Sequence, residues 1–579
     1  MLPPLTETDT YIFWSANEGA GWMHLLPPLA GRRILCVDAS GAVAWALARE
    51  SREVTVLHWA PHWPDSGHAP SKNLTNVSSV SLDELLRNAH TPGFERYDGL
   101  VIHDPQGARL HESALAGITR LLGDGAPWLA PDGWIYLAAR NPGSLQRWRD
   151  RLRRAVDLQP PPLPAATLPR LLRSAGARRI AVYPYLMVNG RVAEVLPRSG
   201  YRATKNREAQ SERLKEWLFG ARLAPRLAPA IGLVAFRQST TVSTLDALVQ
   251  RIGGLRSSRQ AGGSAPVMKQ YLVFAGHKAI IAAGSPEQDG ADVVAVLTAD
   301  AISSRGRSIE APQLEALARI PAVAPLVPRL LDRFNVDGAR CFVMERIPGV
   351  TLDQDVPPLE RVSEAAHEFL LLLHRETAVQ TAMDEAGFDR LALPVLRAAQ
   401  ERNPEFSSLI GAWLAPLRQA LKEHTLPAVY QHGDFKVENV IYEPTSCRLL
   451  SVIDWEHARR PGLPLLDLLY LLAYNRVIRG AHWTEAIDAL IVRAEWSELE
   501  RRRLEQYMRA FALDASLLPA LRALFLAHHI GCRIHLPTDG ALHDKVSDML
   551  VQLTQVLHDR PVLRVLPAAP HGVPEAMAP

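Results

Sequence analysis

The sequence predicts two folded parts, an α/β domain with a mostly parallel sheet followed by an α+β domain. Up to Tyr185, short apolar runs alternate with helical stretches, which is typical of strands joined by crossover helices. From Val267 onward several β-rich runs precede a long block of helical stretches, which is typical of an α+β domain. Between these patterns, Arg256–Pro266 is rich in Ser, Gly and Arg and predicts a linker or loop.

Length and composition are those of an ordinary globular protein. The 579 residues exceed what one hydrophobic core organises, so more than one domain is expected. Hydrophobic residues make up 47% and charged residues 22%, and the formal net charge is +3. So small a charge gives no reason to expect a nucleic-acid partner or an anionic membrane surface.

Cysteine usage and apolar patterning predict a cytoplasmic protein. The stretch Met1–Asp9 lacks basic residues and an apolar core, so it does not resemble a signal peptide. The apolar run Leu463–Tyr474 is too short to span a bilayer, so no membrane span is expected. The four cysteines have no paired spacing and are expected to be reduced thiols; they are Cys36, Cys341, Cys447 and Cys532.

The first part is expected to alternate strands with helices. The expected strands are apolar and rich in Val and Ile, and Ala- or Leu-rich stretches between them predict the helices. Strands are expected at 32–38, Glu53–His58, Gly99–His103, Trp134–Ala138 and after Gly176, with helices at Ala42–Glu50, Leu82–Asn88, Ser113–Leu122 and Leu168–Ser174. The charged stretch 206–218 predicts a further, solvated basic helix.

The second part is expected to open with strands and close with helices. Strands are expected at Val267–Phe274, Lys278–Ala283, Asp292–Thr298 and Arg340–Glu345, and helices at Leu245–Ile252 and Ser308–Arg319. Further helices are expected at Leu359–Thr377, Pro404–His424, Pro464–Ala473, Thr484–Ala494, Glu498–Leu513, Ser516–His529 and Leu542–His558. Residues 560–579 are rich in Pro and Ala and are expected to be disordered.

One stretch of the second part carries a recognisable set of chemical groups. Asp434 and Asn439 follow an apolar run, and the β-branched runs Val440–Tyr442 and Leu449–Ile453 predict a hairpin that ends at Asp454. Phosphoryl transfer uses such a set, with one Asp to orient a hydroxyl and an Asn plus an Asp to hold Mg²⁺. The alternative is a structural hairpin whose Asp and Asn side chains cap turns.

The spacing H-G-D-x-x-x-x-N followed by I-D-W-E resembles the aminoglycoside phosphotransferase and choline kinase family, which has a protein-kinase-like bilobal fold. The resemblance implies that Asp434 is the catalytic Asp, that His432 braces its loop, and that Asn439 and Asp454 hold Mg²⁺. It also implies structural support from the residues that follow, namely Trp455, Glu456 and the later Asp467 in P-L-L-D-L-L.

The same resemblance implies an ATP site in the small lobe. It places Met344, Glu345 and Ile347 at the hinge beside the adenine, and Glu310 on the helix that pairs with a phosphate-contacting lysine. The family carries that lysine on the third strand, but here this strand reads D-V-V-A-V-L-T. Lys269 and Lys278 lie on earlier strands; one alternative is that they reach the phosphates from another direction, and simple exposure on a strand is the favoured interpretation.

The first part resembles a class I S-adenosylmethionine-dependent methyltransferase, which has a Rossmann-like fold. The phrases L-A-G-R-R-I-L-C-V-D-A-S-G and L-A-P-D-G-W-I-Y-L-A-A-R-N-P carry this resemblance. Two features depart from that family: the turn at Asp38–Ala42 has a single Gly, and His58 stands where an acidic residue is expected to bind ribose. The domain is therefore interpreted as degenerate, and S-adenosylmethionine is not expected as a cofactor.

Together these features predict a fusion protein that transfers the γ-phosphoryl group of ATP to a hydroxyl of a small molecule, with Mg²⁺. Sugars, amino alcohols and natural-product intermediates are the acceptor classes considered. The alternatives are a pseudokinase or regulatory nucleotide-binding scaffold, and a bifunctional methyltransferase–kinase. The predicted boundaries are 1–236 for the methyltransferase-like domain, 237–265 for a linker, 266–350 for the small lobe, 351–560 for the large helical lobe and 561–579 for the tail.

Overall fold

The computed structural model describes the chain in segments, and every statement below concerns these segments. They are residues 21–37, 42–58, 75–104, 115–141, 167–188, 191–195, 228–257, 267–273, 278–285, 291–299, 310–336, 339–352, 359–532 and 540–558. The chain divides into two compact units, which are considered separately. The first unit comprises Met1–Pro357 and Val440–Glu456, and the second comprises Pro358–Asn439 and His457–Pro579.

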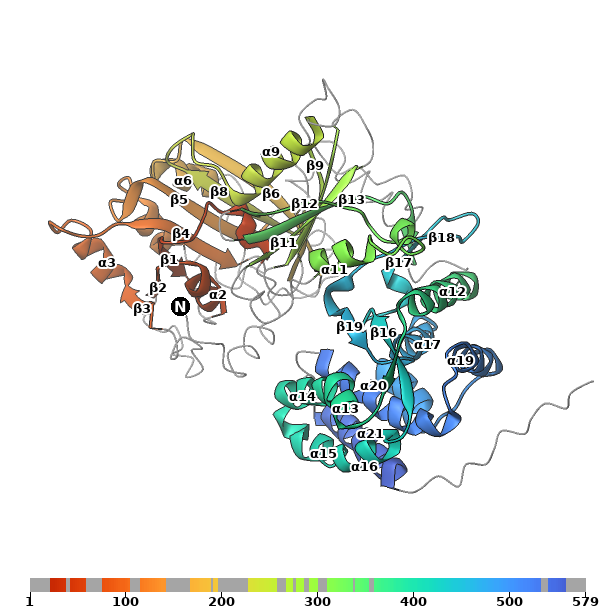
Figure 1. Cartoon of the computed structure of the whole chain (residues 1–579). Coiled ribbons are helices and arrows are strands. Elements are labelled where there is room, and N and C mark those ends of the chain that lie inside the picture. Colours follow the sequence, from red (N-terminus) through yellow and green to blue (C-terminus); the bar gives the residue numbers. More distant parts are fainter. Residues whose placement is uncertain are drawn as a thin grey trace, which may run out of the picture. The chain divides into compact units, whose positions relative to one another are not determined.

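A 13-stranded sheet organises the first unit (Figure 1), with the order β12-β13-β11-β10-β9-β7-β6-β8-β5-β4-β1-β2-β3. Its first part is parallel, as expected for strands joined by crossover helices, and contains β1 (Arg33–Val37), β2 (Glu53–His58), β3 (Val77–Ser81), β4 (Tyr97–Asp104) and β5 (Leu129–Arg140). The helices of this part are α2 (Ala42–Glu50), α3 (Leu82–Asn88), α4 (Leu115–Leu122) and α6 (Thr167–Ser174).

Antiparallel strands extend this sheet without a break into the region expected to be the small lobe. β8 (Ala230–Phe236) pairs with β5, and β6 (Arg179–Val188) and β7 (Arg191–Val195) follow. β7 then pairs with β9 (Val267–Val273), where Val195 lies opposite Tyr271. The remaining strands are β10 (Ala279–Gly284), β11 (Val293–Ala299), β13 (Ala339–Glu345) and β12 (Leu330–Val336), with α9 (Thr244–Ser257) and α11 (Glu310–Leu317). The strands on both sides of the predicted linker thus belong to one sheet.

The core of this unit is also shared across the predicted linker. Alternate residues of the parallel strands face two different buried clusters, because successive side chains of a strand point to opposite faces. Ile34 and Cys36 belong to one cluster, whereas Leu35 belongs to the other. The first cluster continues through Tyr271 of β9 to Val343 of β13. Burial on both faces is the arrangement expected for a doubly wound sheet.

The second unit is mainly helical, and a small sheet with the order β15-β16-β19 leads into the loop that carries Asp434. The strands are β15 (Val379–Ala382), β16 (Thr425–Gln431) and β19 (Arg459–Gly462). Figure 1 shows α12 (Leu359–Thr377) and α17 (Leu466–Ile478) around β16, and both contact one another. The other helices are α13 (Glu385–Leu391), α14 (Leu393–Arg402), α15 (Ser407–Gly411), α16 (Leu414–Leu421), α18 (Trp483–Ile487), α19 (Glu498–Ala510), α20 (Leu518–Cys532) and α21 (Gly540–His558).

Within the described residues, one helical stretch is long and apolar enough to cross a membrane. It is Ala515–Cys532, which contains α20 and has a mean hydropathy of 1.2. Because 72% of this stretch is buried inside the protein and α20 packs on α14, a helix of a protein core explains it equally well. The sequence analysis considered Leu463–Tyr474 instead and did not single out this helix.

Most expected elements are confirmed, and several were missed. The bounds of α2, β2, α3 and α12 agree with the expectation, and the α/β and α+β classes hold. The expected helix Pro404–His424 is wrong, because the chain forms α15 and α16 with a short turn before each. Gly411 is a poor helix former, and Pro416 lacks the N–H that a continuous helix requires, which explains the interruption. The expected basic helix at 206–218 and the tail lie outside the described residues, and β3, β7, β8 and β12 were not expected.

Candidate active site

The loop that carries Asp434 begins where β16 ends and finishes in a short helical turn, η6 (Val437–Asn439). At its start Gly433 has a φ of +86°, a conformation that residues with a Cβ rarely adopt. A Cβ built on Gly433 would lie 2.4 Å from the carbonyl oxygen of His457. The loop therefore needs Gly at this position both for its backbone angle and for space.

Asp434, Lys436 and Asn439 form a compact polar group on this loop. The Lys436 Nζ lies 2.9 Å from Asp434 Oδ2, and Asn439 Nδ2 donates to the backbone oxygen of Asp434 at 2.8 Å and to its Oδ2 at 3.3 Å. Because the Asn439 amide nitrogen is used in this way, its side-chain oxygen faces elsewhere. The sequence analysis did not single out Lys436, although its position two residues after Asp434 was a usable signal.

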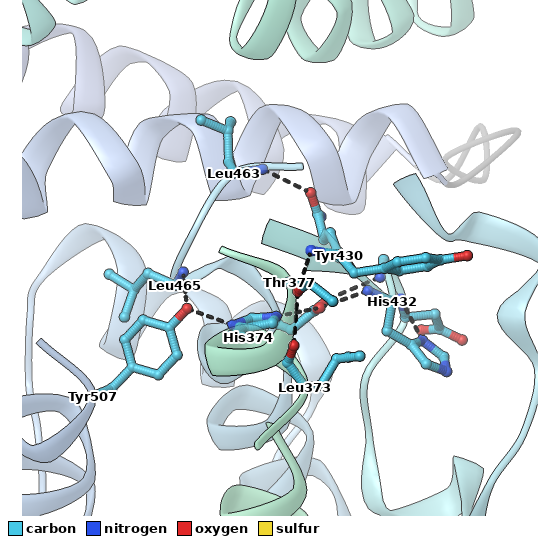
Figure 2. Close-up of polar contacts among 12 residues, drawn as sticks. Leu373, His374, Thr377, Tyr430, His432, Leu463, Leu465 and Tyr507 are labelled. Atoms are coloured by element: carbon cyan, nitrogen blue, oxygen red, sulfur yellow. Dashed lines mark hydrogen bonds and ion pairs between the residues drawn. The ribbon is translucent and has the colours of Figure 1, made fainter. Parts of the chain in front are cut away.

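A buried network fixes this loop from behind (Figure 2). Asp467, in the first turn of α17, accepts hydrogen bonds from the backbone N–H groups of His432 and Gly433, at 2.6 and 2.8 Å. His374 Nε2 lies 3.6 Å from Asp467, and its Nδ1 lies 2.6 Å from the Tyr507 hydroxyl. The backbone N–H of Leu465 donates to that same hydroxyl at 3.0 Å. A Tyr507 proton donated to Nδ1 leaves Nε2–H of His374 to face Asp467, at a distance longer than a hydrogen bond.

The charge state of Asp467 follows from these contacts. Burial raises the pKa of a carboxyl group, but the hydrogen bonds and charges of His374 and His432 outweigh burial here. The pKa of Asp467 is therefore lowered from its ordinary value, and Asp467 is ionised at neutral pH. A negative charge in the first turn of α17 is also favoured by the helix dipole.

Two further side chains contact the same loop. His432 Nδ1 accepts a hydrogen bond from the backbone N–H of Asp434 at 3.3 Å, which agrees with the bracing contact that the resemblance implies. His528 of α20 is fully buried, and its Nε2 lies 2.7 Å from the carbonyl oxygen of Gly433. Burial lowers the pKa of His528, so the ring is neutral and its Nε2–H donates to that oxygen. The sequence analysis did not single out His528 as a support of this loop.

In the first unit the expected hairpin is confirmed. β17 (Val440–Tyr442) and β18 (Leu449–Val452) pair antiparallel, and β14 (Val350–Thr351) adds a third strand. Directly after β18, Asp454 has a φ of +68°, a strained conformation for a residue with a Cβ. Trp455 anchors this turn, because its ring is fully buried and its Nε1 donates to the carbonyl oxygen of Val452 at 2.9 Å.

Asp454 belongs to a cluster of charges around Lys278. The Lys278 Nζ donates to Asp454 Oδ1 at 3.2 Å and to Glu456 Oε2 at 2.9 Å. Glu310, at the start of α11, interacts electrostatically with the same lysine and accepts a hydrogen bond from the backbone N–H of Trp455 at 3.4 Å. The favoured expectation that Lys278 is exposed on its strand is wrong, because 19% of its side chain is exposed and it pairs with two carboxylates.

The cluster has more negative than positive groups, and the pKa values reflect this. Burial raises the pKa of Glu310, the charge of Lys278 opposes this, and Asp454 and Glu456 add to it, so the value is about 7. Burial acts to lower the pKa of Lys278, but the charges of Asp454, Glu456 and Glu310 outweigh it and leave that pKa raised. Lys278 is therefore protonated at neutral pH.

The residues expected at the hinge lie on β13 and directly after it. Met344 is buried, and the Glu345 side chain pairs with Arg329 at 2.9 Å. The backbone N–H of Glu345 donates to the carbonyl oxygen of Arg329, and the carbonyl oxygen of Ile347 accepts from Gly349. These particular backbone groups already have partners within the chain.

A magnesium site can be tested only by the chemistry of its ligands. Among the described residues, no group of three or more His, Cys, Asp and Glu side chains is arranged to hold a metal ion. Mg²⁺ in phosphoryl-transfer sites needs only one or two protein oxygens, since phosphates and waters complete its shell. Taken separately, the amide oxygen of Asn439 in the second unit and the carboxylate of Asp454 in the first unit are oxygen donors of the kind that Mg²⁺ prefers.

One comparison finds a family match within the C-terminal half. Residues 300–510 match the model of the phosphotransferase enzyme family, and this span contains Asp434, Asp454 and Asp467. The C-terminal half carries a phosphotransferase-family domain. The recognition of an aminoglycoside-phosphotransferase-like part is thereby confirmed.

Relatives of known sequence cover only part of the chain. Aminoglycoside 3'-phosphotransferase of Streptomyces fradiae is 31% identical over 156 residues, which cover 25% of this chain and 56% of the relative. Acyl-CoA dehydrogenase family member 10 of Mus musculus is 29% identical over 226 residues, or 36% of this chain, so the chain spans 20% of that relative's length. Among solved structures, a SAM-dependent methyltransferase from Archaeoglobus fulgidus aligns with 36% of this chain and 87% of its own, at 16% identity and a TM-score of 0.25.

All four cysteines are among the described residues, and none of them forms a disulfide. Cys36, Cys341 and Cys447 are buried, and Cys532 is partly buried next to His528.

The end of β2 is His58, where an acidic residue would serve a ribose. The single-Gly turn at 38–41 lies outside the described residues.

Proposed function

We propose that the phosphotransferase-family domain is a small-molecule kinase, which transfers the γ-phosphoryl group of ATP to a hydroxyl. The observation that carries this proposal is the polar group of Asp434, Lys436 and Asn439 on a loop fixed from behind by Asp467. A catalytic group must be held by its surroundings to act on a bound substrate, and this loop meets that condition. The acceptor classes are those expected from the sequence, namely sugars, amino alcohols and natural-product intermediates.

In this mechanism Asp434 orients the acceptor hydroxyl and takes its proton. Both described contacts of the Asp434 carboxylate involve Oδ2, which leaves Oδ1 to accept the hydroxyl proton. The hydroxyl oxygen forms a bond to the γ-phosphorus while the bond to the bridging oxygen breaks, and ADP leaves with that electron pair. Lys436 remains protonated, because the charge of Asp434 outweighs its burial, and it places positive charge beside the reacting oxygens.

The cofactor part of the proposal assigns Asn439 and Asp454 to Mg²⁺. When bound, the ion offsets phosphate charge, which is a large part of catalysis in phosphoryl transfer. His432 and Asp467 act through the loop backbone, and Trp455 holds the turn that carries Asp454. The hinge after β13, with Met344, Glu345 and Ile347, is proposed to face the adenine. The protein is proposed to work in the cytoplasm, in agreement with its free thiols.

Turnover with a panel of hydroxyl compounds tests this proposal. The purified chain is mixed with ATP, Mg²⁺ and each acceptor class, and formation of ADP and of the phosphorylated product is followed by mass spectrometry. We expect Asp434→Asn to lower the rate about 10²- to 10⁴-fold, the usual contribution of a positioned acid–base group. The variant should still bind Mg-ATP. A variant that phosphorylates its acceptor at the wild-type rate would contradict the assigned role of Asp434.

One observation favours a second function, a pseudokinase or regulatory nucleotide-binding protein. Strand β11, where the related enzymes carry a lysine, has neither Lys nor Arg over Val293–Ala299. The second function predicts binding of Mg-ATP with no product from any acceptor. Binding together with acceptor-dependent ADP release excludes it.

A further inference from the structure

Lys278 is a largely buried cation for which the proposed mechanism has assigned no role. Its ammonium donates to Asp454 and Glu456, and Glu310 lies within electrostatic reach. A buried ammonium is costly unless it is paired, so a single carboxylate would serve to stabilise it. Among the described residues, three carboxylates share this one lysine, so their negative charge exceeds its positive charge, which a purely structural ion pair does not require.

The position of Lys278 relative to β11 identifies what this cation can reach. β10 and β11 are antiparallel, and Ala279 of β10 lies opposite Leu297 of β11. Continuing this register by one residue places Lys278 opposite Thr298. Residues directly opposite in antiparallel strands have Cβ atoms about 4.5–5.5 Å apart. The Cβ atom of Lys278, directly before β10, therefore lies near that of a residue at the end of β11, and side chains from the two positions can reach the same region.

The charges of the cluster favour a ligand that carries both a divalent cation and an anion. A divalent cation on Asp454 would offset the excess negative charge, and the ammonium of Lys278 would then be available to an anion beside that cation. Phosphate oxygens suit this role, because charge-assisted hydrogen bonds from an ammonium to phosphate are among the strong ones. A magnesium–polyphosphate group combines the two charges in one ligand.

We propose that Lys278, directly before strand β10, contacts the phosphates of the bound nucleotide in place of a lysine on β11. The inference rests on the proposed function and names the residue that completes its phosphate site. It also removes the reason for regarding the chain as a pseudokinase, since the phosphate-binding cation is present but comes from a different strand. The site takes a nucleoside di- or triphosphate with Mg²⁺ and discriminates it from the free nucleoside.

Nucleotide binding by Lys278→Met tests this assignment without any need for the acceptor. A fluorescent ATP analogue is bound to the full chain with Mg²⁺ and displaced by ATP or by adenosine. We expect the affinity for ATP to fall about 10- to 100-fold, the range of one charge-assisted hydrogen bond, and the affinity for adenosine to stay within about twofold. Lys269→Met, on the neighbouring strand β9, is the matched control, because it removes the same charge from a different strand, and it should bind ATP as the wild type does.

Two further variants keep the test decisive. If Lys278→Met alone is unstable, Lys278→Met with Glu456→Gln removes one carboxylate together with the cation and should show the same selective loss of ATP affinity. Adding Thr298→Lys to Lys278→Met should recover part of that affinity, because it supplies the cation from the opposite strand. Unchanged ATP affinity, or equal losses for ATP and adenosine, overturns the assignment of Lys278. A wild-type protein that does not bind Mg-ATP overturns the proposed function, and the assignment with it.

Discussion

Asp467 and Glu310 are both buried carboxylates, but their surroundings differ in kind. Asp467 accepts two backbone hydrogen bonds and faces His374, so its pKa is lowered and its charge is satisfied within the protein. Glu310 shares one lysine with two other carboxylates, and its pKa is raised to about 7. The first arrangement stabilises a loop through contacts within the protein. The second leaves several carboxylates around one lysine, and a bound cation can offset their negative charge. The comparison separates a supporting carboxylate from carboxylates that serve a ligand.

Removing the supporting carboxylate should have the largest effect on stability. Asp467→Ala leaves the buried N–H groups of His432 and Gly433 without an acceptor, at a cost of about 3–5 kcal/mol in total. Hydrogen exchange of the peptides around these amides measures the free energy of loop opening. Asp389→Ala is the matched control, because Asp389 pairs with Arg418 on the surface and such pairs contribute about 0–1 kcal/mol. Equal effects of both substitutions would show that the loop does not depend on Asp467.

The same carboxylate predicts a direction of pH dependence. The pKa of Asp467 is lowered in the folded protein from an ordinary value of 3.8, so its contribution to stability is fully present above that value. The contribution is lost as the pH falls below 3.8 and through the folded-state pKa. Loop opening should therefore rise in acid for the wild type and depend less on pH in Asp467→Asn. A variant with the wild-type acid profile would contradict this assignment.

Substituting Gly433 in the loop should lower stability by a smaller amount. A comparison with Gly480 separates the steric contact of the added Cβ from the cost of the backbone conformation. Gly433→Ala adds a Cβ that would lie 2.4 Å from the carbonyl oxygen of His457 at a φ of +86°, so we expect a loss of about 2–4 kcal/mol. Gly480→Ala has a similar φ of +101° but meets nothing within 4 Å, so only the backbone cost of about 1–2 kcal/mol should appear. Thermal unfolding of the two variants measures the difference. Identical shifts would mean that the contact with His457 has no energetic weight.

The sequence predicted the elements and groups that depend on local pattern. The alternation of β-branched residues around a turn was enough to place β17 and β18, and the spacing from His432 to Asn439 was enough to name the loop residues. The pairing of β7 with β9 was not foreseeable, because the two strands are far apart in the sequence and neither carries a local signal for its partner. For this reason the predicted linker gave no hint of one continuous sheet.

The charge contacts were the least predictable part of the site. Lys278 was interpreted as exposed, because its partners Asp454 and Glu456 lie 176 and 178 residues later in the chain. The roles of His374 and Tyr507 were missed for the same reason, since an isolated His or Tyr on a helix usually belongs to the core. Lys436 differs, because it is a neighbour of Asp434 in sequence and could have been found from the motif itself.

The most direct test of the account is the thermal unfolding of the full chain with and without Mg-ATP, compared between wild type and Asp454→Ala. A ligand that binds only the folded state raises the unfolding temperature by mass action. The account predicts a clear upward shift for the wild type, a much smaller one for Asp454→Ala, and none with ATP when Mg²⁺ is removed by chelation. Equal shifts in both proteins would contradict the assignment of Asp454 to the magnesium–nucleotide complex, and no shift in the wild type would contradict the proposed kinase activity.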